Sequence, residues 1–171
     1  MFRIPGSGGL LIGSWDLHQD TPKIQKLRYG EFPNVSMSAL QTMESCISSA
    51  HLVESGPTRE TFLVKWYKKL KKSTTSGRLI TETYHLIVFK LDDQGNAVPT
   101  KDIGDLCIFL SDSEPFCVLA SSFPDVLRPN ELVTYAINEH FDFCLTESLV
   151  KTKYSDPDIR APYHIPPQYI D

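Results

Sequence analysis

The densest group of chemically active side chains in the sequence is a basic stretch with two aromatic residues beside it. Its members are Lys65, Lys68, Lys69, Lys71, Lys72 and Arg78, with Trp66 and Tyr67. Ammonium groups of this kind can grip phosphates while aromatic rings stack on bases, as in single-strand binders, or they can form a nuclear-import address. Trp66, however, lies at every second position with Phe62 and Val64, so it is expected to share their apolar face and point into the core.

The same stretch also has a simpler interpretation as a charged loop between two strands. The segment 68–78 contains Ser73 and Gly77, which are typical of loops. We therefore favour a solvated loop over a nucleic-acid site. The candidate contacts with a phosphate or a partner are Lys68, Lys69, Lys71 and Lys72.

Other side chains that could bind a ligand or take part in catalysis have weaker sequence patterns. Asp92-Asp93 can bind a cation in principle, but the chain continues into Gly95-Asn96 instead of alternating oxygen ligands closed by a glutamate, so a solvated hairpin is expected. His85 lies among apolar strand residues, where a hydrogen-bonded structural imidazole is the commoner outcome. The glycines of segment 6–9 lack the spacing of a phosphate-binding loop, and P-loop, zinc-protease and serine-hydrolase motifs do not occur. The sequence thus predicts no catalytic residue, no cofactor site and no metal site.

The cysteines indicate neither a disulfide framework nor a zinc site. Cys46, Cys107, Cys117 and Cys144 contain no CxxC pair, and no histidine completes a zinc-ligand spacing. We expect reduced thiols in the core.

Composition excludes several classes of protein. The 171 residues are 41% hydrophobic and 22% charged, which disfavours a disordered, collagen-like or coiled-coil chain. The net charge of −4 is not the basic footprint of a dedicated nucleic-acid binder. No stretch resembles a signal peptide or a membrane span, so we expect no membrane association and a cytoplasmic or nuclear location.

The chain divides into three zones. Residues 1–50 combine glycine-rich turns with a short helix that starts at Ser38, with Gln41 completing a capping box and Leu40, Met43 and Ile47 on one face. Residues 51–147 form a β-rich core, and residues 148–171 form a proline-containing tail, extended or mobile.

The β-rich zone has the spacing of an antiparallel meander. Segment 61–67 alternates as a half-buried strand, and segment 83–91 is apolar on both faces and predicts a core strand, followed by a hairpin turn at 92–96. Four more short apolar runs follow at 106–110, 116–119, 132–137 and 141–145, separated by turn residues. No helical period separates these strands, so we expect an all-β fold, mainly antiparallel, instead of a βαβ fold.

Several short strings in order give the chain a family resemblance. They are Pro22 to Tyr29, Leu52 to Ser55, Phe62 to Val64, Val88 to Asp92, Asp102 to Asp105, Phe109 to Ser111 and Ser121 to Pro124. This series resembles the carboxy-terminal half of the plant KIB-type β-propeller family, whose domain usually follows an F-box. The residues of these strings are most similar to those of a crucifer branch that lacks the F-box and is associated with organelles. This similarity implies a mitochondrial or plastid location as the alternative to the cytoplasm or nucleus.

The resemblance implies propeller blades and a role in protein interaction. Two positions depart from the pattern: Asp125 follows Phe-Pro in place of glycine, and Ala97-Val98 replaces an aromatic hairpin residue. No F-box precedes the matching part. A blade takes about 40 to 45 residues, so we expect a partial propeller-like meander of about two to four blades with unpaired terminal strands.

We therefore expect a non-enzymatic protein-interaction module that holds an unknown protein partner on loops or by edge-strand pairing. The first alternative is the substrate-recognition part of an SCF-type ubiquitin ligase, with an F-box supplied by a longer isoform. The second is an enzyme whose site forms only on folding.

Overall fold

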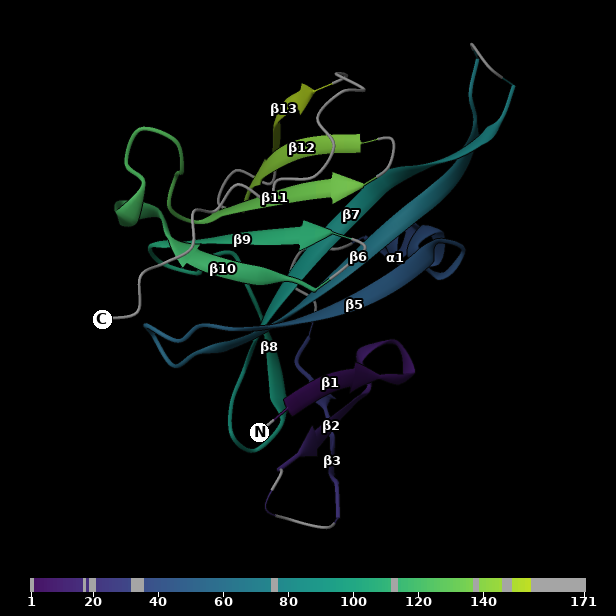
Figure 1. Ribbon diagram of the computed structural model, residues 1–171. Helices are drawn as coiled ribbons and strands as arrows, with labels where there is room; N and C mark the ends of the chain where they lie inside the picture. The colour runs from purple at the N-terminus through teal and green to yellow at the C-terminus, as the bar shows by residue number, and fades with distance from the viewer. Residues whose placement is uncertain are drawn as a thin grey trace.

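The structure is a computed structural model, and it describes residues 2–16, 18, 21–31, 36–74, 77–111, 114–136, 139–145 and 149–154. The fold is mostly β-strand with one α-helix (Figure 1). The first sheet has the order β1-β2-β3 and consists of β1 (Phe2–Gly6), β2 (Leu11–Trp15) and β3 (Lys23–Lys26). The central sheet has the order β4-β8-β7-β6-β5 and consists of β4 (Arg28–Tyr29), β5 (Ile47–Glu54), β6 (Thr61–Lys72), β7 (Leu79–Leu91) and β8 (Asn96–Thr100). The third sheet has the order β10-β9-β11-β12-β13 and consists of β9 (Leu106–Ser111), β10 (Phe116–Leu119), β11 (Glu131–Ala136), β12 (Glu139–Cys144) and β13 (Leu149–Tyr154).

The central sheet is buried on both faces because its two longest strands are apolar on both. Phe62, Val64 and Trp66 of β6 lie on the face toward the third sheet, all at 0% exposure. Leu63 of β6 and Phe89 of β7, also at 0%, lie on the opposite face. The predictions that Trp66 faces the core and that segment 83–91 is a core strand are confirmed. The prediction of a half-buried strand over segment 61–67 is wrong, because packing on the second face buries Leu63 too.

Two hydrophobic clusters follow from this arrangement. In the first, the central sheet packs against Leu106, Ile108 and Leu110 of β9 and Leu132 of β11. In the second, it packs against Ile12 of β2, Leu27, and Met43 of the helix. Because β6 and β7 contribute to both clusters, the two cores share one sheet.

The helix is displaced from its predicted start. Helix α1 runs over Met37–Glu44, and its N-cap is Ser36, whose hydroxyl accepts a hydrogen bond from the amide of Ala39 at 3.2 Å. The prediction of Ser38 and Gln41 as the capping box is wrong, because the helix begins at Met37 and Ser38 therefore lies inside its first turn. Ile47 does not share the helical face either, since it begins β5.

The mainly antiparallel, partly propeller-like fold is confirmed, with two parallel contacts that a simple meander lacks. β11 pairs in parallel with β9, since β10 lies at the sheet edge, and the two residues Arg28 and Tyr29 pair in parallel with Asn96 and Ala97 of β8. The chain between β10 and β11 contains the short 3-10 helix Ala120–Ser122 and brings β11 to the far side of β9.

Two further predictions concern the ends of strands. The hairpin at 92–96 is present, with Gly95 at φ +83° and the Asp92 amide bonded to the carbonyl of Asn96 at 3.1 Å. In the segment predicted as a tail, Leu149–Tyr154 forms β13 and pairs with β12. The remainder of that segment, residue 148 and residues 155–171, lies outside the described residues.

Candidate interaction surface

The basic stretch lies on a projecting two-stranded arm. β5 pairs with β6 only as far as Ile47 opposite Lys68, whereas β6 and β7 continue together to Lys72 opposite Leu79. Figure 1 shows these two strands rising beyond β5 and α1 at the upper right. The prediction of a loop over 68–78 is therefore wrong for Lys68–Lys72, which belong to β6, whereas Ser73, Thr74, Gly77 and Arg78 lie outside the strands. Lysine side chains do not prevent ladder bonds on exposed strands, which explains why the pattern was misleading.

We define the lysine arm as residues 68–74 and 77–83. It carries five cations, Lys68, Lys69, Lys71, Lys72 and Arg78, against one carboxylate, Glu82, although the whole chain has a net charge of −4. This concentration of positive charge produces a local field that attracts acidic groups.

One face of the lysine arm exposes apolar side chains next to lysines. Leu70 pairs with Thr81 and Lys72 pairs with Leu79, so these four side chains share a face. Leu70 is 60% exposed and Leu79 is 71% exposed. Sequence reasoning missed both leucines because a loop has no faces, whereas the strand period places each of them beside a lysine.

The opposite face is more polar. Lys71 forms an ion pair with Glu82 at 3.1 Å, and the Lys69 ammonium lies 3.7 Å from the centre of the Tyr84 ring. Both partners of the ion pair are well exposed, and exposed pairs of this kind contribute only about 0 to 1 kcal/mol. A carboxylate from another molecule can therefore compete for Lys71.

Trp66, beside the lysine arm, is not arranged for base stacking. Trp66 is fully buried, donates from Nε1 to Thr83 Oγ1 at 2.8 Å, and is covered by the Lys68 ammonium at 3.7 Å from the ring centre. A buried ring cannot offer a face to a nucleotide.

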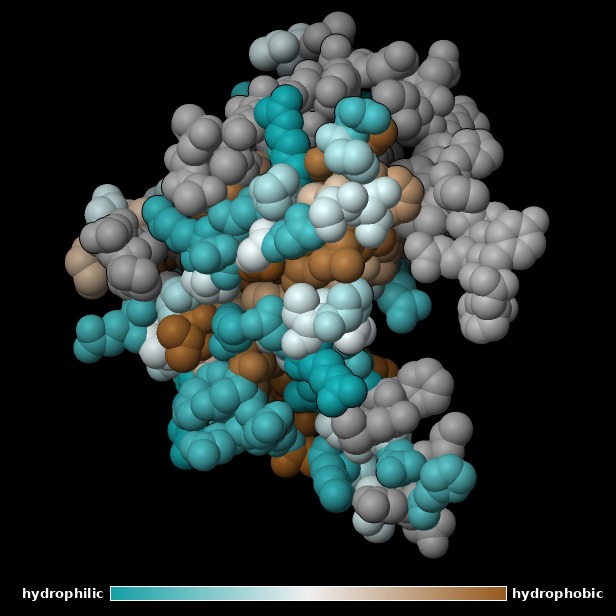
Figure 2. Space-filling view, turned by 90° about the vertical axis from the view of Figure 1, so that its left-hand side faces the viewer, coloured by the Kyte–Doolittle hydropathy of each residue, from teal (hydrophilic) through white to brown (hydrophobic). Residues whose placement is uncertain are grey.

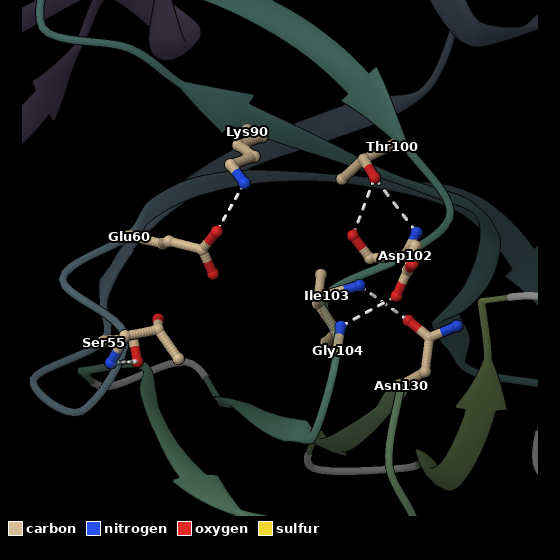
Figure 3. A network of polar contacts seen from close by, with 9 residues as sticks. Ser55, Glu60, Lys90, Thr100, Asp102, Ile103, Gly104 and Asn130 are labelled. Carbon is tan, nitrogen blue, oxygen red and sulfur yellow. Dashed lines mark hydrogen bonds and ion pairs between the residues drawn. The ribbon is translucent and has the colours of Figure 1, made fainter.

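A second group of polar contacts joins the central sheet to the third sheet (Figure 3). The Thr100 hydroxyl donates to the carbonyl of Asp102, and the Asp102 carboxylate accepts from the amide of Gly104, which has φ +67°. The amide of Ile103 donates to Asn130 Oδ1 at 2.9 Å. Because every contact serves a backbone turn, the Asp102 to Asp105 string has a structural role here.

The remaining candidates from the sequence also have local structural roles. The Asp92 carboxylate accepts from the amides of Gln94 and Asn96 and from the Asn96 side chain, and these bonds lower its pKa. His85 lies opposite Tyr67, and burial followed by the charge of Lys101 lowers its pKa. Contacts within the fold thus account for the shifts of both groups.

Two half-buried tyrosines and a lysine form a third cluster. The Tyr29 hydroxyl donates to the carbonyl of Gly9, and burial followed by the nearby Tyr67 raises the pKa of Tyr29 to about 12. The Lys65 ammonium lies 4.2 Å from the Tyr29 ring centre, and burial lowers its pKa. The positive φ angles of Gly8 and Gly9 bring this turn against Tyr29, so the glycine-rich segment is a packing element.

The cysteines and the possible metal ligands form neither a disulfide nor a metal site in the described residues. Cys46, Cys107 and Cys117 are reduced thiols, and burial raises the pKa of Cys117. The side chain of Cys144 lies outside the described residues. In the described part of the chain, no three histidine, cysteine or acidic side chains gather into a metal-binding group. None of the helices in that part is long and apolar enough to cross a membrane.

Apolar residues are also exposed on the first sheet. Ile4 pairs with Gly13, which pairs with Ile24, and the Trp15 ring lies over Gly13. The exposed fractions of Ile4, Trp15 and Ile24 are 56%, 43% and 71%. The side at the left of Figure 1 is different: Figure 2 shows mainly polar residues there, with smaller apolar areas between them.

Comparisons with known proteins gave one match. The family model described as KIB1-4 beta-propeller matches residues 7–144, a range that includes the whole lysine arm. No curated protein and no solved structure matches the chain.

Proposed function

Because the chain belongs to the KIB1-4 β-propeller family, we propose that it is a non-enzymatic protein-interaction module that holds its partner on the lysine arm. The observation that carries this proposal is the arm itself. It extends past the strands on either side and exposes lysines together with Leu70 and Leu79. Interfaces combine an apolar centre with a charged rim, and this arm offers both.

The contacts favour a protein partner over a nucleic acid. Phosphate binding uses the lysines alone and leaves Leu70 and Leu79 in water, whereas a protein can bury both leucines and pair with the lysines. The burial of Trp66 supports the same choice because single-strand binders need exposed rings.

Affinity purification with matched charge variants tests the proposal. The arm variant replaces Lys69, Lys71 and Lys72 with glutamine and leaves Lys68 on Trp66. The control variant makes the same charge change at the exposed Lys23, Lys26 and Lys101.

We expect the wild-type protein and the control to retain the same set of proteins, and the arm variant to lose at least about nine-tenths of it, with retention falling as salt rises. Equal retention by all three proteins contradicts the proposal. Salt-sensitive retention of RNA in place of protein, lost in the arm variant, contradicts it as well.

A further inference from the structure

The outer edge of β6 on the lysine arm has backbone groups available for another strand. β5 reaches only as far as Lys68, so Lys69–Lys72 have a described strand partner on the β7 side alone. The amide of Ser73 donates to the carbonyl of Arg78 at 2.8 Å. Bonded and non-bonded pairs alternate in an antiparallel ladder, so the N–H and C=O groups of Leu70 and Lys72 point away from β7. By the same alternation, those of Leu79 and Thr81 point outward on the opposite edge.

The lysines determine which strand this edge can accept. Lysines on an edge strand protect it against indiscriminate pairing, because an added strand of basic or apolar residues leaves their charges repelled or buried without a partner. An acidic strand places carboxylates directly opposite Lys69, Lys71 and Lys72, and opposite charges at facing positions stabilise a strand pair. Leu70, at 60% exposure, adds a place for one apolar side chain.

We propose that the outer edge of β6, Lys69–Lys72, receives an acidic extended segment of a partner protein as an added β-strand. Main-chain hydrogen bonds to Leu70 and Lys72 provide the pairing, and the lysine ammonium groups select acidic residues. The occupant is acidic at most positions and apolar opposite Leu70. This inference rests on the proposed function and names the chemistry of the partner.

Peptide binding to matched proline variants tests the strand addition. The probe is a fluorescent heptapeptide with a central valine, two glutamates on each side and threonine at both ends, and its counterpart carries lysines in place of the glutamates. Leu70→Pro removes an outward N–H from the β6 edge, and Leu79→Pro removes one from the β7 edge, without removing a β6–β7 ladder bond. Leu70→Ala separates the effect of the leucine side chain from that of its N–H.

We expect the glutamate peptide to bind the wild-type protein and Leu79→Pro alike, to bind Leu70→Pro at least about tenfold more weakly, and to bind Leu70→Ala at an intermediate level. Amide exchange at Leu70 and Lys72 should slow when this peptide is present. Loss of binding in Leu79→Pro, or unchanged binding in Leu70→Pro, overturns the assignment of the edge.

A charge exchange gives a second test that does not depend on proline. The double variant Lys69→Glu, Lys72→Glu should lose the glutamate peptide and bind the lysine peptide. If the wild-type protein binds neither peptide while the arm variant still loses its protein partners, strand addition is wrong and the proposed function stands. If the wild-type protein binds neither peptide and the arm variant keeps its protein partners, the proposed function is overturned as well.

Discussion

At the residue scale, Asn130 joins the loop that follows β8 to the third sheet. Its side chain accepts from the amide of Ile103 and donates to the carbonyl of Lys101 at 2.8 Å, while its backbone bonds to Leu106 and Leu145. Its φ of +61° is unusual for a residue with a side chain. Asparagine suits this position because it tolerates the left-handed conformation and can bond nearby backbone.

We expect Asn130→Ala to lower the free energy of unfolding by about 2 kcal/mol, since it loses two hydrogen bonds and makes the backbone conformation less favourable. Asn130→Gly loses the same bonds but accepts the positive φ, so it should be less destabilising. Urea denaturation measures both. Equal stability of Asn130→Ala and the wild-type protein contradicts the role of this residue.

His85 makes stability depend on pH. Burial and then Lys101 lower its pKa in the folded state, so the unfolded state binds more protons between that pKa and about 6.5. Stability from the neutral imidazole is therefore present above about pH 6.5 and decreases as the pH falls below it. In urea denaturation between pH 5 and 7, His85→Gln should reduce this slope, whereas the control His18→Gln at an exposed position should keep it. An unchanged slope in His85→Gln would show that another group is responsible.

At the scale of elements, α1 is a short helix whose start depends on one hydroxyl. Ser36 supplies the side-chain bond at the N-terminus, and Met43 buries the other end of the helix against the central sheet. A helix of this length has little stability of its own, so both contacts are needed.

We expect Ser36→Ala to lower the free energy of unfolding by about 1 kcal/mol and Ser38→Ala to lower it by less, because only Ser36 caps the helix. Thermal and urea unfolding of the two variants measure the difference. A larger loss in Ser38→Ala supports the original prediction of the cap.

At the scale of the whole molecule, the two clusters on either side of the central sheet stabilise each other. β6 and β7 contribute to both, so loss of one cluster exposes a face of the same strands. The outermost strands of the three sheets, by contrast, have a strand partner on one side only within the described residues: β1, β3, β4, β5, β10 and β13.

These edges predict a partial propeller with surface that is available for association. We expect the purified protein to bind the dye ANS and to self-associate as its concentration rises, because edge strands pair with other chains. Thermal unfolding with dye fluorescence and light scattering measures this. A monodisperse monomer that melts sharply without binding dye contradicts the idea of an unclosed fragment.

The sequence by itself determined the strands, the faces and the turn residues of the core. The strand over segment 61–67, the two apolar faces of segment 83–91 and the Asp92 to Asn96 turn follow from local stereochemistry, and all three are present. The half-burial expected for segment 61–67 is not found, because Leu63 on its second face is fully buried as well. The family resemblance came from the same strings, and the match over residues 7–144 supports the family itself.

Only the tertiary structure decided where the lysines lie. Their composition is that of a loop, but pairing of β6 with β7 beyond the end of β5 makes them part of a projecting arm with two faces and open edges. The parallel contact of β11 with β9 was decided in the same way, since the position of β10 at the sheet edge is not encoded in a local period. Strand order depends on long-range packing, which neighbouring residues in the sequence do not specify.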